Sequence, residues 1–178
     1  MRSILFFPLI TGVAFCADSG PVGPITLYEL KKCEPDINNI DLEAKLETAD
    51  DGSNILTASF TIPEDYGEEV QFRVVADKWE NDDWKRNVWS MNPASFLKFI
   101  SENLEKTWGN FREAVEPKIE DAMKVPKGEY KLEKHQQEWH DVELSQVIYG
   151  RFLATVYLIA GGEEFACLQA ELETFEEE

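Results

Sequence analysis

The sequence predicts a mainly β protein, an antiparallel β-sandwich or cup with one amphipathic helix at its rim. In several short segments apolar and polar residues alternate, and turn signals separate these segments, which is typical of strands that bury one face. In the middle of the chain the apolar residues recur at helical spacing instead. The chain has 178 residues, which is enough for one domain with a sizeable core.

The first half of the chain predicts four strands. Residues 40–47 (IDLEAKLE) and 55–62 (ILTASFTI) alternate apolar and polar side chains, and the Asp-Asp-Gly-Ser run at 50–53 is a turn signal between them. These two segments are expected to form a hairpin. Residues 68–79 (EEVQFRVVADKW) repeat the alternation, and an acidic turn then leads to residues 84–91 (WKRNVWSM).

The period changes in the middle of the chain. Apolar side chains at helical spacing predict an amphipathic helix of about four turns that begins at Asn92 or Pro93. Its apolar face consists of Phe96, Phe99, Ile100, Leu104 and Trp108. Packing on a core is the simplest role for this face, and covering an open end of the sandwich is the more specific one. Residues 109–128 are less regular and are expected to form a loop with helical turns.

Short strands return after Gly128. Residues 129–134 (EYKLEK) and 138–144 (EWHDVEL) are the first of them. The apolar run 152–160 is too short to cross a bilayer, which takes about 20 apolar residues. A Gly-Gly turn separates this run from the alternating segment 166–172, so the two segments predict a β-hairpin.

The N-terminus has the layout of a secretory signal peptide. Arg2 precedes an apolar core, and the small residues Ala14 and Cys16 lie just before the expected cleavage site at Ala17. A buried N-terminal strand or an anchor is the alternative. The expected division of the chain is a signal peptide at 1–16, a single domain at 17–175 and an acidic tail at 176–178.

Removal of the leader leaves two cysteines, Cys33 and Cys167. In a secreted chain such a pair predicts one disulfide, which ties the first strand to the last, and two free thiols are the alternative. The expected location is extracellular, with the lysosomal lumen as an alternative. The net charge of −18 argues against a nucleic-acid partner, because nucleic-acid binders present a basic face.

No motif in the sequence predicts catalysis. His135, Glu138 and His140 have the residue types of a zinc-protease motif, but the histidines are five positions apart and a strand would place them on opposite faces. There is no nucleophile elbow, phosphate-binding loop or calcium loop. We therefore expect no enzyme, no metal and no cofactor, with an unrecognised carboxylate site as the remaining enzymatic alternative.

The C-terminal third, residues 124–175, resembles a known family. A Pro-x-x-Gly-x-Tyr-x-Leu element, a Gly-x-Phe strand, a two-glycine hairpin and a last strand with one cysteine follow in order, and an earlier cysteine follows an N-terminal strand. The residues are Pro126, Gly128, Tyr130, Leu132, Gly150, Phe152, Gly161, Gly162, Cys167 and Cys33. This order resembles the ML lipid-recognition superfamily, especially its ganglioside-activator branch, and the insect contact-chemosensation B branch is similarly close. The rest of the chain matches by the order of its elements.

The resemblance implies an Ig-like ML fold, a cup-shaped sandwich whose sheets separate and admit a lipid tail, and it implies a Cys33–Cys167 bridge. Relatives usually carry further cysteines beside the helix and before the Pro-x-x-Gly element. This chain has none there, so its rim at 92–128 is expected to lack covalent links and to be more mobile.

Such a site is apolar inside and polar only at its mouth. The candidate cavity residues are Leu46, Phe60, Phe72, Val74, Trp89, Phe96, Phe99, Leu104, Trp108, Phe152 and Val156. For each of them, packing in an ordinary core is the alternative. Trp84, Trp89 and Trp108 are also candidates for a lip that faces a membrane or the ligand, because indole suits the boundary between oil and water.

These expectations lead to one function and one main alternative. The first is a secreted, non-enzymatic binder or carrier of a lipid or other hydrophobic small molecule, which presents this molecule to a hydrolase or to a chemosensory receptor. Its expected partners are the small molecule and a membrane surface or receptor. The alternative is an extracellular β-sandwich interaction protein, such as a venom or immune component, with no ligand cavity.

Overall fold

The structure is a computed structural model of the chain. It describes residues 19–21, 23, 25–37, 40–49, 53–92, 94–137 and 147–176. The predicted signal peptide at 1–16 lies outside the described residues, and so do Pro93, Glu138, His140 and the end of the acidic tail. The described chain is mainly β, with antiparallel sheets packed together as a sandwich or cup, which confirms the predicted fold class.

The described chain has strands, then helices, then strands again, and the predicted strand at 138–144 lies outside the described residues. The elements are β1 (Ser19–Gly20), β2 (Ile25–Lys32), β3 (Leu42–Thr48), β4 (Asn54–Ile62), β5 (Gln71–Glu80), β6 (Asp83–Met91), α1 (Phe96–Asn103), α2 (Glu105–Ala114), β7 (Gly128–Gln137), β8 (Val147–Ile148), β9 (Gly150–Ala160) and β10 (Glu163–Thr174).

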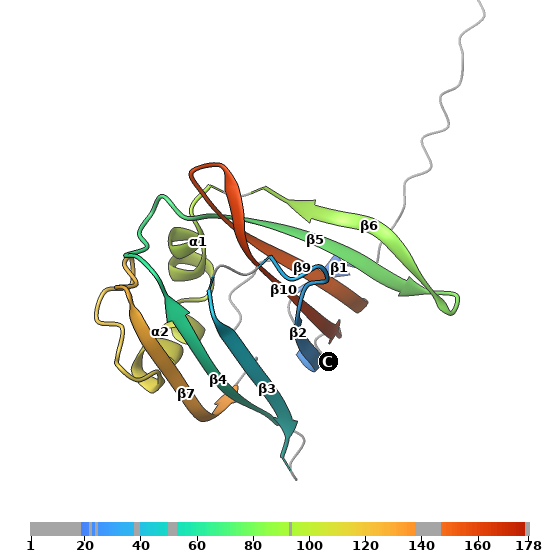
Figure 1. The fold of residues 1–178 in the computed structure, drawn as a ribbon. Coiled ribbons are helices and arrows are strands. Elements are labelled where there is room, and N and C mark those ends of the chain that lie inside the picture. Colours follow the sequence, from blue (N-terminus) through green and yellow to red (C-terminus); the bar gives the residue numbers. More distant parts are fainter. Residues whose placement is uncertain are drawn as a thin grey trace, which may run out of the picture.

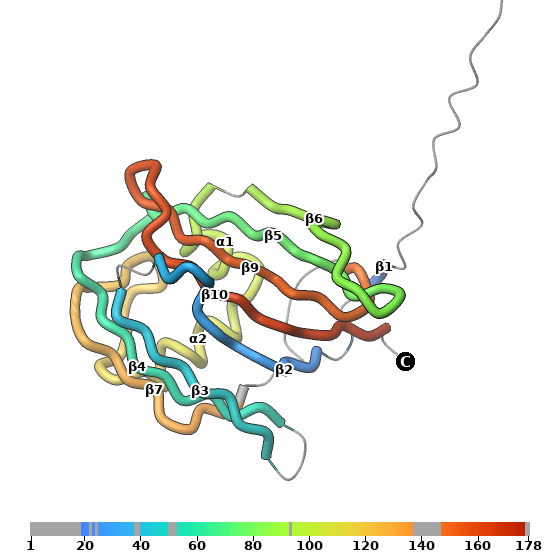
Figure 2. Tube along the Cα trace, turned by 45° about the vertical axis from the view of Figure 1, so that its right-hand side comes forward, coloured from blue at the N-terminus to red at the C-terminus, as the bar shows by residue number. Residues whose placement is uncertain are grey.

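The described strands form a large sheet, a small sheet and a short ribbon. Their orders are β2-β10-β9-β5-β6, β3-β4-β7 and β1-β8. The large and small sheets face each other, and α1 and α2 lie between them at one end (Figure 1). Figure 2 shows the same two layers from a second direction. The helices therefore cover one end of the sandwich, as the mid-chain position of the helical segment predicts.

The strand pairing confirms both predicted hairpins. β3 pairs with β4 from Leu42 opposite Phe60 to Thr48 opposite Asn54, and β9 pairs with β10 along almost its whole length. The glycines of the second turn, at 161 and 162, have φ angles of 59° and 86°. Two consecutive positive φ angles are typical of the type I′ hairpin turn, which most side chains disfavour.

The helical segment differs from the prediction of one helix that ends near Trp108. The structure has two helices, and α2 continues to Ala114. The first helix also begins later than the predicted start at Asn92 or Pro93, because Ser95 is its N-cap and the Ser95 hydroxyl accepts a hydrogen bond from an N–H of the first turn. Leu104 interrupts the helix with a φ of −138° and a ψ of 39°. The apolar spacing continues across this break through Phe111, so both helices pack on the same core.

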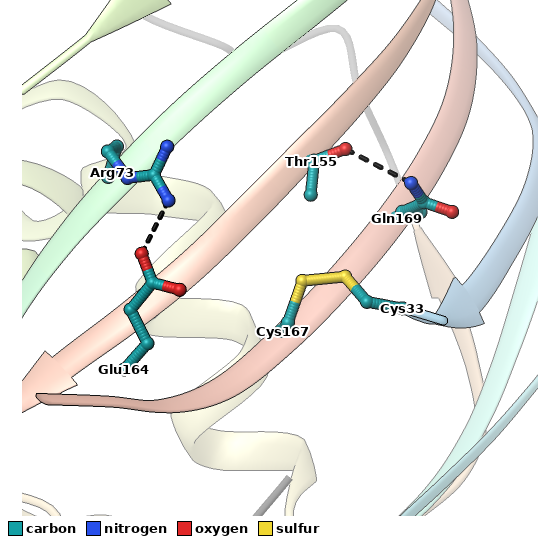
Figure 3. The surroundings of a disulfide bond; sticks show 6 residues. All are labelled: Cys33, Arg73, Thr155, Glu164, Cys167 and Gln169. Carbon is teal, nitrogen blue, oxygen red and sulfur yellow. Dashed lines mark hydrogen bonds and ion pairs between the residues drawn. A yellow bond between two sulfur atoms is a disulfide. The ribbon is translucent and has the colours of Figure 1, made fainter. Parts of the chain in front are cut away.

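Cys33 and Cys167 form a disulfide, as the sequence predicts. The bond joins the end of β2 to β10, and the two Cα atoms are 5.5 Å apart. Figure 3 shows it beside an ion pair between Arg73 and Glu164 and a hydrogen bond of 3.2 Å from Gln169 to a threonine of β9. A disulfide of this kind is typical of proteins from oxidising compartments such as the extracellular space.

Candidate hydrophobic cavity

A cavity lies between the two sheets at the end that the helices cover. Its volume is about 360 Å³, within the usual range for sites that hold small molecules. The lining side chains come from both sheets, both helices and the connecting loops. They are Ile40, Leu42, Phe60, Ile62, Tyr66, Val70, Phe96, Leu97, Ile100, Leu104, Thr107, Trp108, Phe111, Ile119, Val125, Leu158, Phe165 and Leu168.

The alternation of the strands explains the apolar walls. Leu42 and Phe60 are direct partners across β3 and β4, so their side chains share the inner face of the small sheet. Leu158 on β9 and Leu168 on β10 line the cavity from the large sheet. Because alternate positions of these strands face inward and are apolar there, an acidic chain encloses an uncharged space.

Stacked aromatic rings connect the small sheet to α2. The ring of Phe60 lies 6.3 Å from that of Phe111 and 5.1 Å from that of Tyr130, measured between centroids. The Trp108 and Phe111 rings are 5.6 Å apart and nearly parallel. Offset stacks of this kind add to the stability that burial alone provides. They place α2 as a wall of the cavity.

Hydrogen bonds fasten the loop after α2 to the helix. The indole N–H of Trp108 donates to the carbonyl of Ala122 at 3.0 Å. The guanidinium of Arg112 donates to the carbonyls of Ile119 and Glu120 at 3.0 and 3.1 Å. These contacts hold the loop after α2 against the helix, within the rim at 92–128. Greater mobility of this rim stays a prediction.

A second fastening joins the loop after β4 to the segment before β7. Tyr66 and Val125 exchange two backbone hydrogen bonds of 2.9 and 2.8 Å. Beside them, the ammonium of Lys124 lies 2.7 Å from a carboxylate oxygen of Asp65. This contact, with the backbone N–H of Lys127, lowers the pKa of Asp65 below its ordinary value. Burial raises the pKa of the Tyr66 phenol.

Of the predicted cavity residues, Phe60, Phe96, Leu104 and Trp108 line the cavity. Phe72 and Phe99 lie next to it, where the Phe72 ring packs against those of Phe96 and Phe99 at 5.5 and 5.0 Å. The remaining predicted residues do not line it; they are Leu46, Val74, Trp89, Phe152 and Val156.

The physical reason is that alternation identifies a face of a strand but not a position along it. Leu46 and Leu56 are partners on the inner face of the small sheet, four positions beyond the lining residues Leu42 and Phe60. Trp89 lies on β6, the last strand of the large sheet, and 40% of its surface is exposed. Trp84, on the same strand, packs against the exposed indole of Trp79. Of the three tryptophans predicted to form a lip, only Trp108 lines the cavity.

Several lining residues carry a weak sequence signal or none. Phe111 continues the spacing from Leu104 and Trp108, so extension of the helical pattern would have found it. Ile119 and Val125 come from an irregular loop, and no period marks them as inward-facing. Phe165 follows the last hairpin turn, where the register shifts between Glu164 and Ala166.

His135 lies on the small sheet beyond the cavity. It pairs with Leu56 across β4 and β7, on the inner side of the strand. Burial lowers the pKa of its imidazole from the ordinary value of 6.5.

The other residues of the HQQEWH run, Glu138 and His140, lie outside the described ranges. Among the residues that are described, no three potential metal ligands lie together.

His135 predicts a loss of stability on mild acidification. The unfolded imidazole, with the higher pKa, takes up its proton first, so the free energy of unfolding falls as the pH drops below 6.5 towards the folded pKa. In His135→Gln this loss should be absent. Urea denaturation at about pH 7.5 and 5.5 measures the difference. An equal pH dependence in both proteins would show that His135 titrates as freely in the folded state as in the unfolded one.

Comparison with models of protein families gave no match, and neither did comparison with curated proteins. No helix within the described ranges is long and apolar enough to cross a membrane.

Proposed function

We propose that this chain is a secreted, non-enzymatic binder or carrier of a lipid or another hydrophobic small molecule, which it holds between its two sheets. The cavity is the observation that carries this proposal. It has about 360 Å³ of space and a lining without a charged side chain. Such a space favours an apolar ligand, because each methylene group that leaves water for an apolar site contributes about 0.8 kcal/mol.

The resemblance to the ML lipid-recognition superfamily supports the same function. The motif that carries it, from Pro126 to Cys167, includes Tyr130, whose ring stacks on the lining residue Phe60. The predicted signal peptide and the disulfide fit a protein that acts outside the cell or in the lysosomal lumen. Presentation of the ligand to a hydrolase or to a chemosensory receptor is part of this proposal.

Native mass spectrometry of the secreted protein tests it. We expect a stoichiometric adduct that is released into an organic extract and identified there as a lipid or hydrocarbon. The protein should also take up an uncharged, apolar fluorescent probe. A protein that is secreted empty and takes up no apolar probe would favour the alternative, an interaction protein that binds through its exterior. The apolar residues exposed on β6, Val88 and Trp89, favour that alternative.

A bulkier side chain in the cavity should block uptake. Leu104→Trp adds an indole at the junction of the two helices, where Leu104 lines the cavity. We expect the affinity for the probe to fall by about 5- to 150-fold, since overpacking costs about 1–3 kcal/mol. Fluorescence titration measures the change.

Leu46→Trp is the matched control. It makes the same substitution on the inner face of the small sheet, at a residue that does not line the cavity. Its affinity should stay close to that of the unmodified protein, and circular dichroism should show both variants folded. Equal affinities in the two variants would place the probe outside the cavity.

A further inference from the structure

Thr107 is the one residue with an aliphatic hydroxyl among those that line the cavity. None of the lining residues is Asp, Glu, Lys or Arg. A charged group of a ligand would therefore lose its water without gaining a partner, which is strongly unfavourable. The lining accordingly excludes ligands that bury a carboxylate, phosphate or ammonium group.

Two other lining residues, Trp108 and Tyr66, also carry a polar group on a largely apolar side chain. The indole N–H of Trp108 is already engaged with the carbonyl of Ala122. The Tyr66 ring packs on Phe165, with centroids 5.0 Å apart, and its backbone is paired with Val125. The phenol of Tyr66 is therefore the other group that could hydrogen-bond a ligand in the cavity. A variant without this phenol is needed as a control.

The Thr107 hydroxyl oxygen is buried and has no hydrogen-bond partner among the described residues. A threonine inside a helix commonly bonds to the carbonyl three or four positions earlier. For Thr107 those carbonyls belong to Leu104 and Asn103, at the break between the helices. The Leu104 carbonyl accepts the backbone N–H of Trp108 at 2.8 Å, and Asn103 belongs to α1. Neither of these carbonyls accepts the Thr107 hydroxyl in the structure.

The start of α2 also lacks a side-chain cap. Leu104 occupies the N-cap position and makes no side-chain hydrogen bond there. The N-terminal turn of a helix carries partial positive charge and favours oxygen acceptors. Thr107 belongs to this turn, and a threonine in a helix has two accessible side-chain rotamers. Thr107 lines the cavity, but its hydroxyl oxygen is buried in the structure, so the hydroxyl reaches a ligand only by turning to the other rotamer.

We propose that Thr107 hydrogen-bonds the single polar group of the ligand, and that the ligand is an uncharged carbonyl compound, such as an ester, ketone or aldehyde, on an apolar body. This inference rests on the proposed function and specifies it. A partner for the hydroxyl is supplied only when the ligand is bound, so Thr107 selects among apolar molecules of the same size.

Displacement of a neutral fluorescent dye by three molecules of equal chain length tests this selection. They are pentadecane, the methyl ketone of the same length and pentadecanoic acid, used at a pH where the acid is ionised. We expect the ketone to bind about five times more tightly than the alkane, the usual net effect of one hydrogen bond. The acid should bind most weakly.

Three variants test whether the preference for the ketone comes from the Thr107 hydroxyl. Thr107→Val replaces the hydroxyl by a methyl group and should lose the preference, so that the ketone binds no more tightly than the alkane, because its carbonyl is then buried without a partner. Thr107→Ser keeps a hydroxyl and should keep the preference. Tyr66→Phe should also keep it. A preference that survives in Thr107→Val, or that is lost in Tyr66→Phe, would overturn the proposal.

The stability of the empty protein gives an independent readout. If the hydroxyl has no partner without ligand, Thr107→Val should raise the Tm of the empty protein or leave it unchanged, because replacing an unpaired buried polar group by an apolar one is not destabilising. A lower Tm would reveal an internal partner and would refute the role of Thr107.

Equal binding of ketone and alkane by the unmodified protein would also refute the role of Thr107, while leaving the carrier function in place. Failure to bind any of the three molecules or the dye would instead refute the carrier function.

Discussion

Replacing both Cys33 and Cys167 by serine should lower the free energy of unfolding by about 5 kcal/mol in the chain-entropy model. The bridge joins residues 134 positions apart, so its loss releases a very long loop in the unfolded chain. Cys167 is fully buried, and serine there adds the cost of burying a hydroxyl. Because domains are commonly stable by only about 5–15 kcal/mol, the variant should be largely unfolded in modest urea. Urea denaturation followed by tryptophan fluorescence measures the loss.

Reduction provides the control for this result. A thiol reductant should lower the stability of the unmodified protein by a similar amount and should leave the double variant unchanged. If the double variant has the same urea midpoint as the unmodified protein, the bridge does not stabilise the fold. In that case the fold depends on strand pairing and the core alone.

Leu132→Ala should cost about 2–5 kcal/mol of unfolding free energy, the range for large-to-small changes in a packed core. Leu132 is fully buried on β7, opposite Ala58 of β4. It does not line the cavity, so the lost volume becomes a new void rather than an extension of the binding space. Chemical denaturation measures the cost, and the affinity for an apolar probe should be retained.

Leu46→Ala is the matched comparison on the same sheet. Leu46 is only half-buried, so the same deletion removes fewer contacts and should cost less than half as much. Equal costs at the two positions would show that β3 is as tightly packed as β7. That result would contradict the difference in burial between the two side chains.

The strands were predictable because their side chains alternate. The pairing of Leu42 with Phe60 and the hairpin at Gly161 follow directly from the period of two and from the turn residues. The disulfide between Cys33 and Cys167 was predictable from the cysteine count and from the family resemblance. All of these are local or compositional signals, which one sequence carries.

The end of the helical segment was not predictable in the same way. Gly109 and the polar residues of α2 weaken its apolar pattern, and tertiary packing through Phe111 outweighs this local signal. The break at Leu104 depends on how two helices fit over one space, which no local period records.

The candidate site was predictable only in part. Phe60 and Phe96 were found because they lie on apolar faces near the covered end of the sandwich. Val74 and Val156 are partners on the inner face of the large sheet, two positions along from Phe72 and Leu158. The sequence contains nothing that shows how far along a strand the cavity extends. Residues from irregular loops, such as Ile119, escape any argument from periodicity.

The edge strand β6 bears on aggregation. It ends the large sheet, and no described strand pairs with its outer side, so its backbone is open to strands of other molecules. Lys85 and Arg86 place exposed charges on it, and Asn87 has a φ of 54° where the register with β5 shifts. A charged and locally distorted edge resists the addition of a second chain. We therefore expect the protein to stay dispersed at high concentration, although it exposes Val88 and Trp89 on the same strand.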